Sequence, residues 1–91
     1  MMLDCGEFLD ITQIQQWQTA ALAQLVGITE DLNIDVSALQ KIDTAGIQAL
    51  VAVVQYVEAR GHNVVWSELS PAFINAATIL GLQNTLRMKP E

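Results

Sequence analysis

Three short segments of the sequence place carboxylate or hydroxyl side chains immediately before an apolar helical pattern. They are Asp10-Ile11-Thr12, Asp43-Thr44 and Ser70-Pro71. Side-chain oxygens at such positions accept hydrogen bonds from the orphan backbone N–H groups of a helix N-terminus. The same N–H groups can hold a phosphate, and the helix dipole favours the negative charge. Each junction is therefore a candidate helix cap, a candidate binding site, or both.

Thr44 stands where an expected loop enters a helix, after Asp43 and before the small residues Ala45 and Gly46. A phosphate at such a helix start would add about −1.5 to −2 charges, which the helix N-terminus tolerates but an adjacent acid repels. Gly46, without a β-carbon, would let a partner backbone approach closely. Asp-Thr before a helix is most often only a cap. Asp10 has the same two interpretations, as a cap or as the rim of a docking site.

Other chemistry has less support in the sequence. Asp10, Asp35 and Asp43 could suggest a Mg²⁺ pocket of the response-regulator type. The chain is too short for five strands and five helices, however, and it lacks a lysine at the end of a fifth strand. Asp35 lies within an expected strand and is interpreted as structural. We therefore predict no metal site.

Catalytic machinery is also not evident. His62 follows Gly61 in an expected turn and should face solvent, with no serine or cysteine nucleophile to pair with it. No glycine-rich phosphate loop is present. Cys5, the only cysteine, is expected to be a small buried hydrophobe. We predict a protein that is not an enzyme and that uses no cofactor.

The elements that would position these residues follow from apolar periodicity. Short strands and longer helices alternate, which implies an α/β fold with a largely parallel sheet and right-handed crossovers. Because three strands are few, a further strand is expected from the N- or C-terminal stretch. Trp17 and Trp66 should be core residues, and Leu86 and Met88 are candidate packing residues. The expected strands are 1–5, 32–36 and 64–66. The expected helices run from Asp10 or Thr12 to Val26, from Asp43-Thr44 to Arg60 and from Ser70-Pro71 to Leu80. Residues 37–43 are expected to form a loop.

The composition limits the classes of partner that the protein can bind. The 91 residues carry a net charge of −6, and apolar residues make up 52% of them, enough for one core in a single domain spanning 1–91. Nucleic-acid binding needs the opposite charge, so neither DNA nor RNA nor an anionic membrane is an expected partner. A basic protein surface suits this field better. Asp4 interrupts the first apolar residues before a signal peptide could form, and no stretch is long enough to span a membrane, so we predict a cytosolic location.

Several segments together resemble the STAS family, the sulfate-transporter and anti-sigma-factor-antagonist domains. The family's Asp-Leu-Ser, short loop and Asp-Ser/Thr-x-Gly pattern is similar to residues 34–50, with Asp43-Thr44-Ala45-Gly46 at its core. Gly6-Glu7-Phe8-Leu9-Asp10 is similar to the family's Gly-Glu-Leu-Asp turn with one extra residue. Residues 61–66, Ser70-Pro71 and 79–82 resemble the family's next strand and its last helix. The resemblance covers about residues 6–83.

The resemblance implies a STAS-type α/β fold, a small mostly parallel or mixed sheet with three main helices packed on it. Family members usually have two strands before the Gly-Glu turn, whereas only residues 1–5 precede it here, so the N-terminal strand region should be shortened. The implied phosphoacceptor is Thr44. The implied partner-binding residues are Asp10, Asp43, Thr44, Ala45 and Gly46.

Two kinds of partner follow from the resemblance. In antagonist members, an anti-sigma factor that is a GHKL-type serine/threonine kinase binds the unphosphorylated domain and releases the phosphorylated one. Such partner switches operate in stress-signalling and chemotaxis systems. Other relatives dock onto the ATPase subunit of a phospholipid transporter through the same threonine. A third hypothesis is a small-ligand binder or enzyme that uses the edge formed by the carboxyl ends of the strands. The sequence does not determine whether the domain dimerises.

Overall fold

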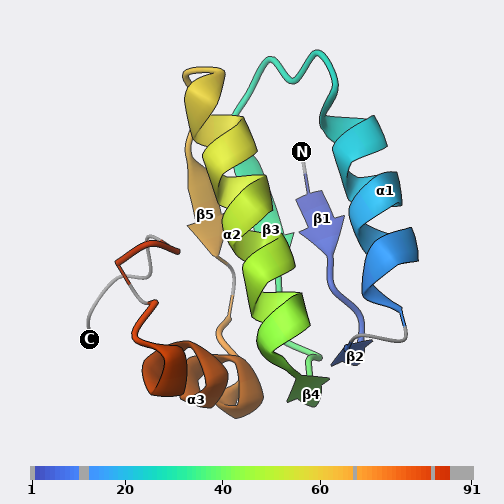
Figure 1. Ribbon diagram of the computed structural model, residues 1–91. Coiled ribbons are helices and arrows are strands. Elements are labelled where there is room, and N and C mark those ends of the chain that lie inside the picture. Colours follow the sequence, from blue (N-terminus) through green and yellow to red (C-terminus); the bar gives the residue numbers. More distant parts are fainter. Residues whose placement is uncertain (1, 11–12, 67, 83, 87–91) are drawn as a thin grey trace.

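A computed structural model describes residues 2–10, 13–66, 68–82 and 84–86 (Figure 1). The elements alternate strand and helix along the chain, as α/β patterning predicts. In order they are β1 (Met2–Asp4), β2 (Phe8–Leu9), α1 (Ile14–Leu25), β3 (Leu32–Asp35), β4 (Lys41–Ile42), α2 (Thr44–Ala59), β5 (Val64–Trp66) and α3 (Pro71–Leu80).

The main sheet has three parallel strands in the order β1-β3-β5. Both crossovers move across the sheet in the same direction, so right-handed connections place α1 and α2 on the same face. The two helices pack against each other along that face (Figure 1). Leu3 and Ile34 point toward the helices and are buried, whereas Met2, Asn33 and Val65 alternate with the buried positions and are exposed. The sheet is thus covered by helices on one side.

A second, two-stranded parallel sheet pairs β2 with β4, with Phe8 opposite Lys41 and Leu9 opposite Ile42. The further strand expected from the N- or C-terminal stretch is β2, but it joins this small sheet and not the main one. The prediction that residues 37–43 form only a loop is wrong, because β4 lies within it. This small sheet sits beyond the carboxyl ends of the main strands, beside the start of α2 (Figure 1).

Helices α2 and α3 begin and end where local signals predicted. Asp43 is the N-cap of α2, and Ser70 caps α3 with Pro71 in its first turn. Gly81 ends α3 in the left-handed conformation, at φ 67°, where a β-carbon would be strained. The start of α1 differs from the prediction: Ile14 is its first residue, and the backbone carbonyl of Asp10 accepts hydrogen bonds from the two N–H groups of Gln13 and Ile14. Thr12, the other expected cap, lies outside the described residues.

The core lies between the helices and the main sheet, with Phe73, Leu25, Leu50 and Ile34 fully buried. Both tryptophans pack against this core but are only half-buried, which partly corrects their expected placement. Trp17 donates its indole N–H to the carbonyl oxygen of Asp4 at 3.2 Å. Trp66 donates to the carbonyl oxygen of Leu86 at 2.8 Å and stacks on Phe73 with ring centroids 4.9 Å apart. Leu86 is buried as predicted, and Met88 lies outside the described residues.

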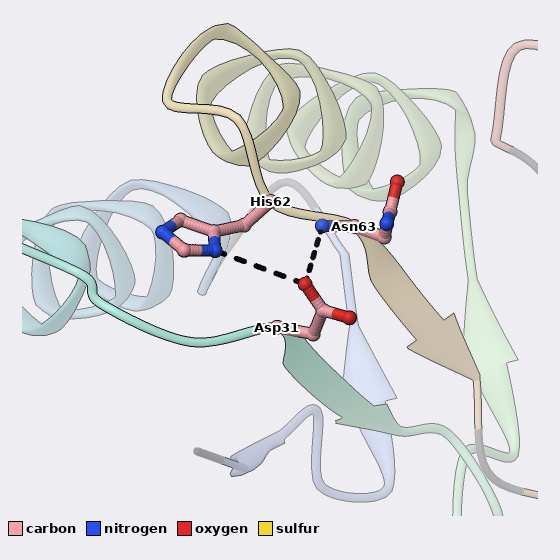
Figure 2. A network of polar contacts seen from close by, with 3 residues as sticks. All are labelled: Asp31, His62 and Asn63. Carbon is pink, nitrogen blue, oxygen red and sulfur yellow. Dashed lines mark hydrogen bonds and ion pairs between the residues drawn. The ribbon is translucent and has the colours of Figure 1, made fainter.

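His62 belongs to a polar cluster at the amino ends of β3 and β5 (Figure 2). One carboxylate oxygen of Asp31 accepts the backbone N–H of Asn63 at 3.0 Å and lies 3.8 Å from His62 Nδ1. The backbone N–H of Leu32 donates to the carbonyl oxygen of Asn63 at 2.9 Å. His62 is half-buried rather than exposed as expected, and its contacts join the two strand starts. This end of the sheet is opposite to the end where Asp43 and Thr44 lie.

Candidate functional site

The start of α2 rests on a framework of backbone hydrogen bonds between two segments that are distant in sequence. The carbonyl oxygen of Glu7 accepts the backbone N–H groups of Gln40 at 2.7 Å and Lys41 at 3.2 Å. The N–H of Asp43 donates to the carbonyl oxygen of Leu9 at 3.4 Å. Together with the β2–β4 pairing, these bonds hold the residues before α2 against the β2 backbone. The position of Asp43 is therefore set mainly by backbone contacts.

Asp43 caps α2 through one side-chain oxygen and its backbone carbonyl oxygen. Its side-chain Oδ1 accepts the backbone N–H of Gly46 at 3.0 Å, and its carbonyl oxygen accepts that of Ile47 at 3.0 Å. The cap interpretation of Asp43 is confirmed. The bond to Gly46 satisfies one of the N–H groups that a helix start leaves orphaned, and the bond to Ile47 is the first regular bond of the helix, so the first turn is fixed around Thr44.

Gly46 is buried, and its α-carbon packs on the β2 backbone. A β-carbon built at this position would clash with the carbonyl oxygen of Leu9 and would lie 2.7 Å from Cγ1 of Ile42. The expectation that the glycine admits a partner's backbone is corrected here. The close approach is made by this chain's own Leu9.

Thr44 is the exposed member of this turn. It is the first residue of α2 and faces solvent, Ala45 is half-buried, and Gly46 is covered. The hydroxyl group therefore stands at the surface of a well-ordered helix start. Thr44 is therefore accessible from solvent without local unfolding.

Asp10 lies at the same edge, because it directly follows Leu9 as Asp43 directly follows Ile42, and those two residues are paired. Asp10 and Asp43 are both half-buried. The structure thus brings Asp10 and Asp43, from two of the three predicted junctions, to the same edge of the small sheet. Their negative charge disfavours a second anion and suits a basic partner surface.

The third junction, at Ser70, has a structural role. Ser70 is only 5% exposed, and its hydroxyl oxygen accepts the backbone N–H of Phe73 at 3.2 Å. It starts α3, which packs against β4 and α2. Ser70 therefore fixes the start of a helix that packs on β4 and α2.

The remaining sequence candidates are structural as well. Asp35 Oδ1 accepts the N–H of Ser37 at 2.9 Å and its hydroxyl at 2.6 Å, which confirms its structural interpretation. Cys5 is buried as predicted, and burial raises the pKa of its thiol to about 12, with further contributions from Asp4 and Asp35. Such a thiol is a poor nucleophile at neutral pH.

In the described part of the chain, no group of three or more His, Cys, Asp and Glu side chains is arranged to hold a metal ion. None of its helices combines the length and apolar character that crossing a membrane requires.

Sequence reasoning missed the part played by β2. The backbone of Glu7 and Leu9 supports the turn through carbonyl oxygens, which every residue type has, so residue identity carries no signal for it. The available signal was the apolar pair Phe8-Leu9 directly after the Gly6-Glu7 turn. Two residues are too few to display a strand period.

Comparison with known proteins agrees with this geometry. No curated protein matches the chain. A family model described as "Mlab, STAS domain" matches residues 6–88, which include the β2–β4 pair, the Asp43–Gly46 turn and all three helices. Because the match covers most of the chain, this protein belongs to the STAS domain family.

Proposed function

We propose that this protein is a partner-switching docking domain in the cytoplasm, and that phosphorylation of Thr44 controls its docking. STAS domains are generally non-enzymatic domains that interact with other proteins, and this general role applies to the chain as a family member. The observation that carries the proposal is the exposure of Thr44 on a helix start where Asp43 and Ala45 are half-buried and Gly46 is buried.

The physical basis of the switch is local charge. The docking surface consists of Thr44 and Ala45 with Asp10 and Asp43 beside them. Gly46 lies beneath this surface and packs against the backbone of Leu9. A phosphate on Thr44 would add about −1.5 to −2 charges next to two carboxylates. Burying that charge in an interface carries a large desolvation penalty, while a helix N-terminus tolerates it in solvent. Phosphorylation therefore weakens docking while the fold persists.

The partner class under this proposal is an anti-sigma factor that is also a GHKL-type serine/threonine kinase, in a stress-signalling or chemotaxis system. Incubation of the protein with its cognate kinase and ATP should add one phosphate, measured by intact-mass spectrometry. Thr44→Val retains the side-chain shape without the hydroxyl group and should remain unmodified. Thr29→Ala, which removes another exposed threonine hydroxyl, should be modified like the original protein.

Docking is measured on the same proteins by calorimetry. The unmodified protein and Thr44→Val should bind the kinase with similar affinity. The phosphorylated protein should bind at least roughly 5-fold more weakly, which corresponds to the lower end of typical coupling free energies. Phosphate incorporation into Thr44→Val at the original level would refute the assignment of the acceptor.

A docking subunit of a phospholipid-transporting ATPase complex is the second candidate. Ala45 supports it, because the turn has a single hydroxyl that can serve as a contact residue without any modification. In that case Thr44→Glu should abolish co-purification with the transporter's ATPase subunit. Treating the native complex with a phosphatase should not change the amount of ATPase subunit that co-purifies. A complex that depends on the phosphorylation state would instead favour the partner switch.

A further inference from the structure

The outer face of the small β2–β4 sheet carries an exposed aromatic side chain. Phe8 is 44% exposed, whereas the adjacent Leu9 is 1% exposed, because successive side chains of a strand point to opposite sides. Phe8 is paired in register with Lys41, which is also exposed. Paired residues of neighbouring strands lie on the same face of a sheet. Phe8 and Lys41 therefore lie together on the side of this sheet that the core does not cover.

This outer face is continuous with the docking surface at the start of α2 (Figure 1). The backbone N–H groups of Lys41 and Asp43 both donate to carbonyl oxygens of the β2 segment, so the parallel pairing extends to Asp43. Asp43 is two residues beyond Lys41, and Asp10 is two residues beyond Phe8. Two residues of extended chain span about 7 Å. A partner that contacts the two carboxylates is therefore brought next to Phe8.

The docking surface is too small to form an interface without its surroundings. A stable protein–protein interface covers about 800 Å² on each partner. Thr44 is exposed, but Asp10, Asp43 and Ala45 are half-buried and offer little area. The contact must extend onto neighbouring residues, and among the large exposed apolar side chains of the described residues Phe8 is the aromatic one. Aromatic side chains are enriched among the few residues that contribute most of the binding free energy of an interface.

The charge at this edge indicates what covers Phe8. Asp10 and Asp43 place two carboxylates between the aromatic side chain and Thr44, in a chain with a net charge of −6. A second copy of this acidic protein or an anionic membrane would bring like charges toward these carboxylates. A basic protein surface is attracted to them. The occupant that fits this edge has basic groups for the carboxylates and an apolar pocket for the ring.

We propose that Phe8 is the aromatic anchor of the docking surface, and that it enters an apolar pocket with a basic rim on the partner that docks at Thr44. This inference rests on the proposed function and adds to it the chemistry by which the partner is recognised. Lys41, opposite Phe8, has the same charge as that rim and slows association. Because the ring and the hydroxyl are separate contacts, Phe8 supplies affinity and Thr44 supplies control.

Calorimetry of the full chain with the cognate kinase tests the anchor. Phe8→Ala should bind at least roughly 30-fold more weakly than the original protein, the loss expected for a residue that dominates an interface. Phe8→Trp, which retains an aromatic side chain, should bind more tightly than Phe8→Ala. Val65→Ala is the matched control, because Val65 is 48% exposed on a strand of the main sheet, and it should bind like the original protein. Circular dichroism and urea unfolding check that each variant is folded.

Lys41→Glu tests the same face without changing buried contacts. It should associate with the kinase at least roughly 2-fold faster at physiological salt, because charges at the edge of an interface act mainly on the association rate. Arg60→Glu makes the same change in net charge at the opposite end of α2 and should associate like the original protein, since salt screens distant charges. Stopped-flow measurements give both rates.

The outcomes separate this inference from the proposed function. Equal binding of Phe8→Ala and the original protein, or equal losses in Phe8→Ala and Val65→Ala, would overturn the anchor and leave the switch at Thr44 in place. Association of Lys41→Glu that is no faster than that of Arg60→Glu would overturn the basic rim. A kinase that neither binds nor phosphorylates the original protein would overturn the proposed function, and the anchor with it.

Discussion

Adjacent residues in the Asp43–Gly46 turn have different environments, and this difference determines what each can do. Asp43 caps the helix, Thr44 faces solvent and Gly46 lies against Leu9. Only the exposed residue can be modified without opening the fold. Cys5 is the opposite case, because its 3% exposure keeps the thiol from reagents and from water.

We predict that Cys5 makes the protein less stable at alkaline pH. Burial raises the pKa of the thiol from 9.0 to about 12, so the native protein retains a proton that the unfolded chain releases. The contribution is fully present below pH 9 and is lost as the pH rises toward 12. The free energy of unfolding should fall by at most about 1.4 kcal/mol per pH unit in that window. Urea unfolding at a series of pH values measures it.

Cys5→Ala is the control for this effect. At neutral pH the variant should be less stable, because it loses a buried sulfur atom. Its free energy of unfolding should change less steeply between pH 9 and 12 than that of the original protein. Parallel pH profiles of the two proteins would contradict the assignment to Cys5.

At the scale of elements, the contact between α2 and β2 positions the candidate site. A helix start and a two-residue strand approach closely because Gly46 has no side chain and because Asp43 bonds to Leu9. Helix α3 supports the same region by packing on β4 and α2. The site therefore depends on contacts among four elements.

We expect Gly46→Ala to destabilise the protein by about 1–3 kcal/mol, the usual cost of overpacking. On an open helix, the same substitution would stabilise by about 1 kcal/mol. The sign reverses here because the new β-carbon would meet the Leu9 carbonyl oxygen and Ile42. Urea unfolding tests this, with Gln48→Ala on the exposed side of α2 as a control that should be neutral or slightly stabilising. A stabilised Gly46→Ala variant would show that β2 does not contact this glycine.

For the whole molecule, the net charge of −6 opposes compactness and favours basic partners. The acids concentrate in the first half of the chain, where Lys41 is the only basic residue among positions 1–59. Repulsion among exposed charges is screened by salt, whereas buried contacts are screened much less.

Raising the salt concentration from very low to physiological should therefore stabilise the protein. We expect a gain of order 1 kcal/mol or less, which corresponds to an increase of about 4–8 °C or less in the unfolding midpoint for a domain of this size. Thermal unfolding monitored by circular dichroism measures it. Sodium chloride and choline chloride should act alike, since screening depends on ionic strength. A decrease in the midpoint would show that attractive pairs dominate.

Local signals predicted α2, β5 and α3 well, because each depends on residues a few positions apart. Ser70-Pro71 starts α3 and Gly81 ends it through backbone bonds within one turn. The boundary of α1 was less accurate, because Asp10 and Thr12 are both good cap residues and the chain uses Gln13 instead. Strand β4 was missed, because Lys41-Ile42 has no strand period of its own and pairs only through contact with Phe8-Leu9.

The sequence by itself determined the order of the main elements, the Asp43–Gly46 motif and the family, since these are encoded in neighbouring residues and their spacing. Only the tertiary structure decided which residue of that motif is accessible. The roles of Gly46 and Asp10 depend on Leu9, which is far away along the chain but adjacent in space. The outer face of the β2–β4 sheet was likewise decided by which of its residues the core covers. Burial results from contacts between distant segments, and no local pattern contains them.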